Sequence, residues 1–284
     1  MATPARGLSR EHVIAVARIA AGLLFMQHGL EKLFGFAGAR PEPTLWAVRG
    51  VGGILETLGG PLIALGLFTR PTAFILSGEM AVAYFRSWAP RGVFPIANGG
   101  EEATLFCYFY LWLWTAGPGA WSLDSLLWPR GRDRRALRIE GARLTAWEPY
   151  TRSLLRIVVG FLFTLHGCRK LFDVLAPVAG RRNAPALAID ALPSLTGWID
   201  LTGGVLLMAG LFVRQTAVVM AAEALLAYAL IAQPRTLWPI RNGGNEALLY
   251  VLICACFAVA GAGAWRVLPG FVQMKSIYLA DDKA

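Results

Sequence analysis

Long apolar runs separated by short polar segments are the dominant pattern in this chain. Runs of about twenty apolar residues, read as helices, are long enough to cross a hydrocarbon core about 30 Å thick. Eight such spans are predicted, at residues 11–34, 50–68, 72–89, 102–120, 152–173, 194–212, 215–232 and 245–264. Backbone polar groups in lipid must be satisfied within each segment, so the predicted fold is an all-α, polytopic helical bundle.

The pattern of the first span returns in the second half of the chain. RIAAGLLFMQHGLEKLF at Arg18–Phe34 matches RIVVGFLFTLHGCRKLF at Arg156–Phe172, with ten of seventeen positions identical. Two later blocks, at 59–73 and 90–102, match 203–217 and 234–246. This agreement indicates one duplicated module. Each copy holds four spans, an even number, so the two repeats are expected to be parallel.

Four segments follow from this duplication. The first repeat covers 1–121, a basic linker 122–150, the second repeat 151–270 and a C-terminal tail 271–284. The second copy carries six extra residues near Val174–Pro193. The N-terminal run lacks a small-residue cleavage site and is expected to be a retained helix.

Composition supports a membrane protein. Hydrophobic residues make up 56% of the chain and charged residues 16%, with a mean hydropathy of +0.52. The net charge is +9, and the linker run PRGRDRRALRIEGAR is expected to be attracted to anionic lipid headgroups. Nucleic acid is not an expected partner, because no soluble aromatic-bearing domain accompanies the run. A small excess of Lys and Arg predicts that both termini are cytoplasmic.

Charged residues inside the spans are the first candidates for function. Buried charges in membranes are costly and usually face a partner or a cavity. Counting depth along the helices predicts an ion pair between Arg18 and Glu79, repeated as Arg156 with Glu223. The simpler alternative is that these pairs only fix helix packing.

A second polar group is predicted near the opposite face. In the first repeat it comprises His28, Lys32, Glu56, Asn98 and Glu102, and in the second His166, Lys170, Asp200, Asn242 and Glu246. Asn-Gly-Gly followed by an acid also fits a simple helix start. The combined set of donors and carboxylates under apolar walls would suit a quinone, whose carbonyls need donors and whose reduction needs protons.

Metal, haem and nucleotide chemistry find little support in the sequence. The four cysteines, Cys107, Cys168, Cys254 and Cys256, form no C-x-x-C pair. Neither a dinucleotide fingerprint nor a P-loop occurs. No bound metal or nucleotide is therefore expected, and electrons would come from a partner protein or from substrate.

The motifs R-x(9)-H-G-x(2)-K-L-F, GLFxR and P-x-x-NGGxE, present in both repeats, resemble the DoxX/DoxD family of small four-helix membrane proteins. The resemblance implies a bacterial cytoplasmic membrane location and a role near the quinone pool, because the family includes the membrane subunit of thiosulfate:quinone oxidoreductase. The second copy diverges from the first at three positions: Gln27, Glu31 and Glu101 correspond to Leu165, Arg169 and Asn245.

Three functions are weighed on this basis. The first is a quinone-linked subunit of an oxidoreductase or respiratory assembly. The second is a non-catalytic accessory subunit that stabilises a larger respiratory or photosynthetic complex. The third is a small-solute or lipid carrier, which the lack of midplane helix breaks disfavours. The first is preferred.

Overall fold

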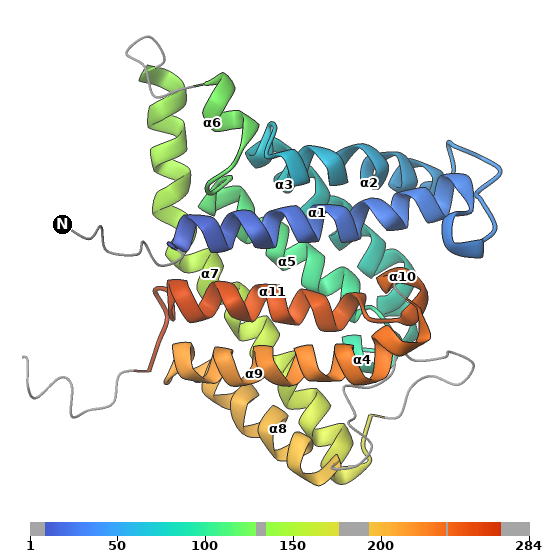
Figure 1. Ribbon diagram of the computed structural model, residues 1–284, viewed down its shortest axis with the longest axis vertical. Coiled ribbons are helices and arrows are strands. Elements are labelled where there is room, and N and C mark those ends of the chain that lie inside the picture. The colour runs from blue at the N-terminus through green and yellow to red at the C-terminus, as the bar shows by residue number, and fades with distance from the viewer. Residues whose placement is uncertain (1–8, 129–134, 176–192, 237, 268–284) are drawn as a thin grey trace, which may run out of the picture.

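The computed structural model describes residues 9–128, 135–175, 193–236 and 238–267, and all regular structure in these ranges is helical. The first repeat is built from α1 (Arg10–Phe34), α2 (Val48–Leu65), α3 (Thr69–Ala83) and α5 (Glu101–Ala116) (Figure 1). The second is built from α7 (Arg135–Phe172), α8 (Pro193–Ala209), α9 (Val213–Ala227) and α11 (Asn245–Ala260).

Shorter elements connect these eight helices. They are α4 (Pro95–Asn98), α6 (Leu123–Leu127), α10 (Pro239–Asn242), three 3₁₀ turns at Phe36–Gly38, Ala89–Arg91 and Gln233–Arg235, and two π-helical segments at Tyr84–Trp88 and Tyr228–Ala232. Each π-helical segment directly extends the third long helix of its repeat, α3 or α9.

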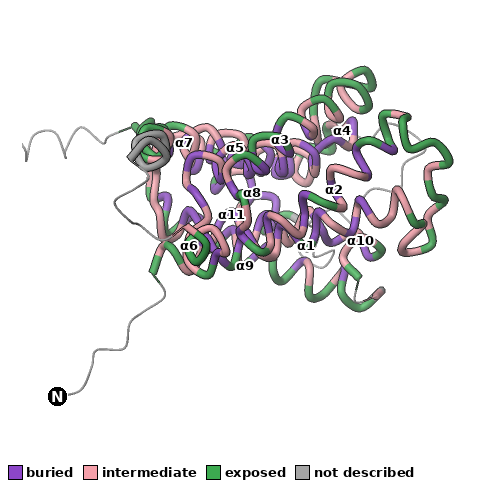
Figure 2. The backbone as a smooth tube through the Cα atoms, turned by 90° about the horizontal axis from the view of Figure 1, so that it is seen from above, coloured by how far each residue is buried: buried purple, intermediate pink, exposed green. Residues whose placement is uncertain are grey.

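The protein is a polytopic membrane protein. Among the described residues, Arg10–Phe34, Val48–Leu65 and Val213–Ala232 are long and apolar enough to cross a bilayer, and Ser194–Ala209 and Asn245–Ala260 are shorter apolar helices. Large apolar side chains remain exposed on the outer faces of the bundle, as at Leu58, Phe74 and Val218. Buried positions lie on the inward faces of the helices (Figure 2), so the outer apolar surface is available to lipid.

Glycines allow the first two helices of each repeat to pack closely. A Cβ at Gly60 of α2 would lie 2.7 Å from the carbonyl oxygen of Gly22 on α1, and a Cβ at Gly22 would lie 2.6 Å from that of Gly60. Gly160 and Gly204 repeat the contact between α7 and α8. Small residues at such crossings let backbones approach in a membrane, where dispersion contacts supply much of the association energy.

The two repeats meet through α1 and α5 of the first and α7 and α11 of the second. α1 packs on α11, and α5 packs on α7. The core between them is aromatic and fully buried, with Phe25, Phe106, Phe163 and Tyr250 at 1% exposure or less. The C-terminal end of α1 contacts the start of α11 through His28 and Asn245, and the C-terminal end of α7 contacts the start of α5 through His166 and Glu101. Both C-terminal ends therefore lie at the same end of the bundle, and α1 and α7 run in the same direction (Figure 1).

Both arginines of the predicted ion pairs bind backbone instead of acids. Arg18 donates to the carbonyls of Ile63 and Ala64, each at 2.6 Å, and to three carbonyls in Pro118–Trp121. The predicted Arg18–Glu79 pair is therefore wrong. The last carbonyls of a helix have no intrahelical partner, and those at the end of α2 accept from the guanidinium instead.

The second repeat gives the same correction. Arg156 donates to the carbonyls of Leu207 and Met208 at the end of α8, and to those of Ala262 and Trp265. The predicted Arg156–Glu223 pair is absent from the described ion pairs, because Glu223 contacts a lysine at the other end of the bundle.

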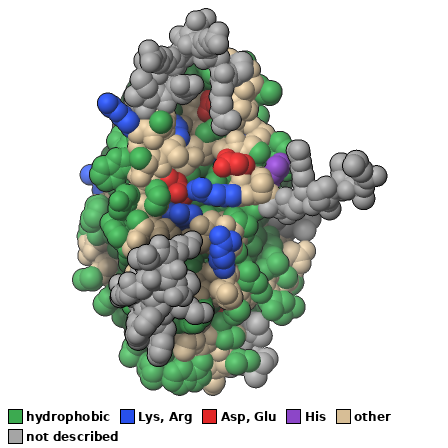
Figure 3. Space-filling view, turned by 90° about the vertical axis from the view of Figure 1, so that its left-hand side faces the viewer, with side chains coloured by type: hydrophobic (Ala, Val, Ile, Leu, Met, Phe, Trp, Pro, Cys, Tyr) green, Lys and Arg blue, Asp and Glu red, His purple; other side chains and the backbone are tan. Residues whose placement is uncertain are grey.

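The end of the bundle that holds these arginines also carries the inter-repeat segment. The amide of Ala120 donates to the carbonyl of Glu11, which ties the chain after α5 to the start of α1. Arg10 pairs with Glu148 of α7 at 2.7 Å, and Arg152 lies 3.5 Å from the same carboxylate. Figure 3 shows basic and acidic side chains gathered near the centre of this end.

Part of the predicted linker is helical. α7 begins at Arg135, so its first turns lie within the segment 122–150, and Pro149 is inside the helix. The predicted insertion near Val174–Pro193 falls mainly on 176–192, and the predicted tail at 271–284; both lie outside the described residues.

Candidate functional site

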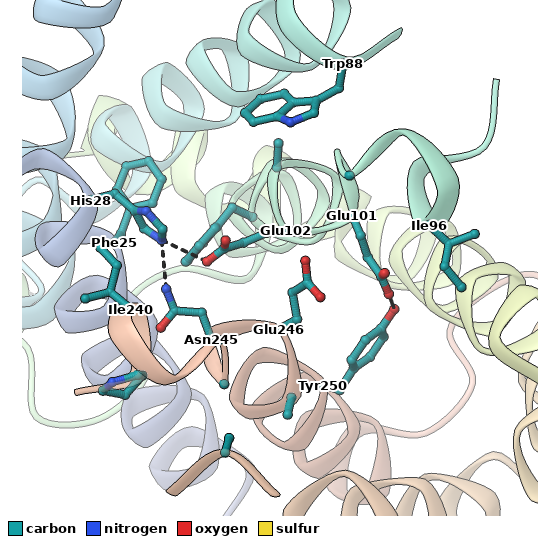
Figure 4. Close-up of a pocket in the computed structure, with 18 of the residues that line it drawn as sticks. Phe25, His28, Trp88, Ile96, Glu101, Glu102, Ile240, Asn245, Glu246 and Tyr250 are labelled. Atoms are coloured by element: carbon teal, nitrogen blue, oxygen red, sulfur yellow. Dashed lines mark hydrogen bonds and ion pairs between the residues drawn. The ribbon is translucent and has the colours of Figure 1, made fainter. Parts of the chain in front are cut away.

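A cavity of about 780 Å³ lies between the repeats, at the end of the bundle opposite the inter-repeat segment. Its walls come from the C-terminal turns of α1 and α7, the N-terminal turns of α5 and α11, and the π-helical segments. Histidine, acidic and aromatic side chains from both repeats point into it (Figure 4). The pseudo-twofold relation between the repeats thus places both copies of the His-Gly motif at one site.

The π-helical segments and the Asn-Gly-Gly loops shape one wall. A Cβ at Gly100 would lie 2.6 Å from the ring of Tyr84, the first residue of the π-helical segment, so only glycine permits this packing. Gly244 and Tyr228 repeat the contact. π-helical turns inside helices are frequent at functional sites. Here they bring Trp88 to the cavity.

Asn98 and Asn242 organise these loops and do not line the cavity. The side-chain oxygen of Asn98 accepts from the amide of Gly100 at 2.7 Å, and its amide donates to the carbonyl of Gly92. Asn242 makes the equivalent bonds to Gly244 and Thr236. Both asparagines are buried. For the asparagines the structure supports the helix-start interpretation, whereas the acids of the same motif, Glu102 and Glu246, line the cavity.

His28 receives polar partners from both repeats. Its Nε2 lies 2.8 Å from the carboxylate of Glu102 on α5 and 2.9 Å from the side-chain amide of Asn245 on α11. Its Nδ1 faces Glu31 on its own helix at 4.0 Å. The side chain keeps 19% exposure, and it opens to the cavity. His28 is therefore surrounded by carboxylates.

His166 occupies the equivalent position in the second repeat with different partners. Its Nε2 lies 2.7 Å from the carboxylate of Glu101 on α5, which also accepts from the hydroxyl of Tyr250. The guanidinium of Arg169 lies 3.3 Å from Nδ1. The side chain of His166 is 5% exposed. Glu101 and its repeat equivalent Asn245 thus each reach the histidine of the other repeat.

The lysines form a second pair of related contacts. Lys32 donates to Glu56 at 2.5 Å. Lys170 donates to Asp200 at 2.6 Å and to Glu223 at 3.2 Å. Lys32 is 23% exposed and lines the cavity with Glu56, whereas Lys170 is 4% exposed.

Sequence reasoning found most of the site and missed its cross-repeat members. His28, Lys32, Glu56, Glu102, His166 and Glu246 line the cavity, as do the unpredicted Glu31, Glu101, Arg169, Asn245 and Tyr250. The signal was available, because positions 31 and 101 differ in charge between the repeats. These differences could be assigned to the site only by knowing which helices of the two repeats pack together, and the pattern of one repeat alone does not contain that information.

Metal ligation has no candidate among the described residues. No group of three or more His, Cys, Asp or Glu side chains there is arranged to hold an ion. The four cysteines are free thiols, distributed over α5, α7 and α11.

The matches to known proteins reflect the duplicated module. A model of the DoxX family matches residues 13–87 and 152–233, one segment in each repeat and together more than half of the chain. An uncharacterised protein of Haemophilus influenzae is 42% identical over 126 residues, covering 41% of this chain and 91% of that protein. Inner membrane protein YphA of Escherichia coli is 34% identical over 133 residues, covering 42% of this chain and 92% of that protein. No solved structure matches the chain.

Proposed function

This chain belongs to the DoxX family as two fused DoxX units, and on that premise we propose that it binds the head group of a membrane quinone in the cavity between them. It would act as a subunit of a quinone-linked oxidoreductase in the bacterial cytoplasmic membrane. The observation that carries the proposal is the convergence of His28, Lys32 and their carboxylate partners Glu102 and Glu56 on a cavity with aromatic walls.

The size and chemistry of the cavity fit such a head group. Pockets for small molecules measure about 300–1,000 Å³ and combine apolar walls with a few polar groups. Phe25, Phe106 and Trp88 supply flat apolar surface. Lys32 and His28 supply donors for the carbonyls of the oxidised form.

Two buried acceptors suit the reduced form. Oε2 of Glu56 and Oδ1 of Asn245 have no hydrogen-bond partner, and both residues line the cavity. A buried acceptor without a donor costs about 1–3 kcal/mol. The hydroxyl groups of a quinol are donors, and they would satisfy these atoms.

Proton exchange is the chemistry that the side chains support. Conversion of a quinone to a quinol takes two electrons and two protons, and the electrons would come from a redox partner protein. The His28–Glu102 and Lys32–Glu56 pairs hold protons at the cavity wall, and the two members of each pair are within hydrogen-bonding distance of one another. A partner complex is therefore part of the proposal.

The topology would follow from eight membrane-crossing helices. Helices α1, α2, α3, α5, α7, α8, α9 and α11 would each cross the bilayer, with both termini cytoplasmic. The cavity would then open near the opposite, periplasmic face, within reach of the quinone pool at the lipid interface.

Binding of a short-chain, water-soluble quinone to the full-length protein in lipid nanodiscs tests the proposal. We expect saturable binding, measured by calorimetry, and at least about a tenfold loss of affinity in His28→Ala, since removing a group that hydrogen-bonds a buried carbonyl costs about 1.4 kcal/mol or more. Gly78→Ala is the matched control, because a Cβ at Gly78 has open space around it. Equal affinity in His28→Ala and the parent protein would contradict the proposal.

The accessory role predicts a different result for the purified protein. In that case the chain would co-purify with a cofactor-bearing complex, and substitutions in the cavity would alter assembly without changing quinone turnover.

A further inference from the structure

We infer that the two repeats have different roles at the site. His28 and Lys32 of the first repeat exchange protons with the contents of the cavity, whereas His166 and Lys170 of the second are fixed hydrogen-bonding anchors. The identity of the cavity's contents rests on the proposed function, but the division between the repeats rests on hydrogen bonds that need no ligand.

The hydrogen bonds of His166 determine where its proton lies. A guanidinium has five donors and no acceptor, so Nδ1 of His166, which lies 3.3 Å from Arg169, must be an unprotonated acceptor. The ring proton is then on Nε2, which donates to Glu101 at 2.7 Å. Neither nitrogen is left to take up a further proton without breaking a contact. His166 is held in one tautomer.

His28 has no such restriction. Its Nδ1 faces the carboxylate of Glu31 instead of an arginine, and its Nε2 faces Glu102 and Asn245. The side-chain amide of Asn245 is a donor and the carboxylate of Glu102 an acceptor, so Nε2 accepts from Asn245 when it is unprotonated and donates to Glu102 when it is protonated. His28 can therefore gain and lose a proton while its neighbours stay in place.

Charged neighbours on the other packed helices strengthen the contrast. Around His28, Lys32 lies one turn along α1, and Glu56 comes from α2 and is bound to Lys32. Around His166, Asp200 of α8 is engaged by Lys170, and Tyr250 of α11 donates to the same carboxylate that His166 contacts. The acids near His166 are thus already occupied.

The lysines show the same asymmetry independently. Lys32 holds one carboxylate and borders the cavity, while Lys170 is held between two carboxylates and is 4% exposed. Separating a buried ion pair is strongly unfavourable, which makes Lys170 a poor proton donor to a ligand. The difference between the histidines comes from one repeat position, which is Glu31 in the first copy and Arg169 in the second, and the difference between the lysines comes from Glu223, which contacts Lys170.

Nuclear magnetic resonance of ¹⁵N-histidine in the full-length protein tests this inference directly. Only three histidines occur, and His12 at the other end of the bundle serves as an internal reference. Between about pH 6 and about pH 10, a range that extends above that of an ordinary imidazole because carboxylates lie around His28, we expect His166 to keep the signature of the Nε2-protonated tautomer. His28 should show ring nitrogens that exchange and shift with pH.

The charge-swap variants show whether positions 31 and 169 are the cause. Arg169→Glu should make the His166 signals behave like those of His28, and Glu31→Arg should fix His28 in one tautomer. Arg169→Met, which removes the donor without adding an acid, should release His166 only in part. An unchanged His12 signal shows that each variant is folded. Parallel pH responses of His28 and His166 in the parent protein would overturn the inference.

Quinone affinity separates this inference from the proposed function. His28→Gln should weaken binding at least about tenfold and His166→Gln less than about threefold, because the side chain of His28 is 19% exposed and that of His166 only 5%. If neither variant changes the affinity while the tautomer asymmetry persists, the quinone proposal fails and the division between the repeats stands. Equal losses in both variants would contradict the division.

Discussion

Gly60 and Gly22 show how single residues fix this bundle. Each lacks a side chain at the point where the other's carbonyl oxygen approaches, and the same holds for Gly160 and Gly204. The repeats conserve this geometry between them even where their charged residues differ. The close approach of the two helix backbones is therefore common to both repeats, whereas the charged residues differ between them.

Replacement of Gly60 by alanine should destabilise the protein. The new Cβ would lie 2.7 Å from the Gly22 carbonyl oxygen, and backbone cannot move aside as a flexible side chain can. Overpacking of this kind costs about 1–3 kcal/mol. We expect a lower midpoint of thermal unfolding in detergent, measured by circular dichroism. Gly78→Ala, with open space at its Cβ, should leave the midpoint unchanged or raise it, and equal effects of the two variants would refute the packing argument.

At the scale of the elements, the helix ends carry the polar interactions that sequence reasoning misassigned. Apolar runs predicted the long helices, and the repeat predicted that the two halves share one design. The partner of Arg18 was not predictable by counting depth along helices, because its long side chain extends to backbone carbonyls near the end of α2. Unpaired carbonyls have no sequence signature, since every residue carries one.

Arg18 should accordingly behave as a structural residue. Arg18→Met would leave the carbonyls of Ile63, Ala64 and Pro118 without their donor, and each unsatisfied buried acceptor costs about 1–3 kcal/mol. Arg18→Lys, with three donors, should recover part of this loss. Thermal unfolding in detergent measures both. A loss of quinone binding in a variant of unchanged stability would contradict this role.

The site could be predicted from sequence only within one repeat. His28, Lys32, Glu56 and Glu102 share a repeat and a bundle end, so spacing placed them together. Asn245 reaches His28 from 217 residues away in the chain, across the pseudo-twofold axis. Which helices meet at that axis depends on tertiary packing between α1 and α11 and between α5 and α7. No local pattern encodes it.

At the scale of the whole molecule, the two repeats form one unit through a buried aromatic core and reciprocal polar contacts. Each repeat completes the histidine environment of the other. The covalent connection between α6 and α7 is therefore not what holds the halves together.

Cleavage of that connection should leave the assembly intact. A protease site introduced in the segment 129–134 and cut after purification should give two fragments that co-elute in size-exclusion chromatography, because α1–α11 and α5–α7 contacts remain. The uncut protein is the control. Separation of the fragments in mild detergent would show that the interface is insufficient by itself.

The cavity and the inter-repeat segment lie at opposite ends of the bundle, and this arrangement has an energetic consequence. With the eight-helix topology proposed above, the two ends would face different aqueous compartments, and protons that enter or leave the cavity would not come from the compartment that holds the segment. Oxidation of a quinol there would release its protons on one defined side of the membrane. The fold itself would then decide whether turnover adds to the proton-motive force or draws on it.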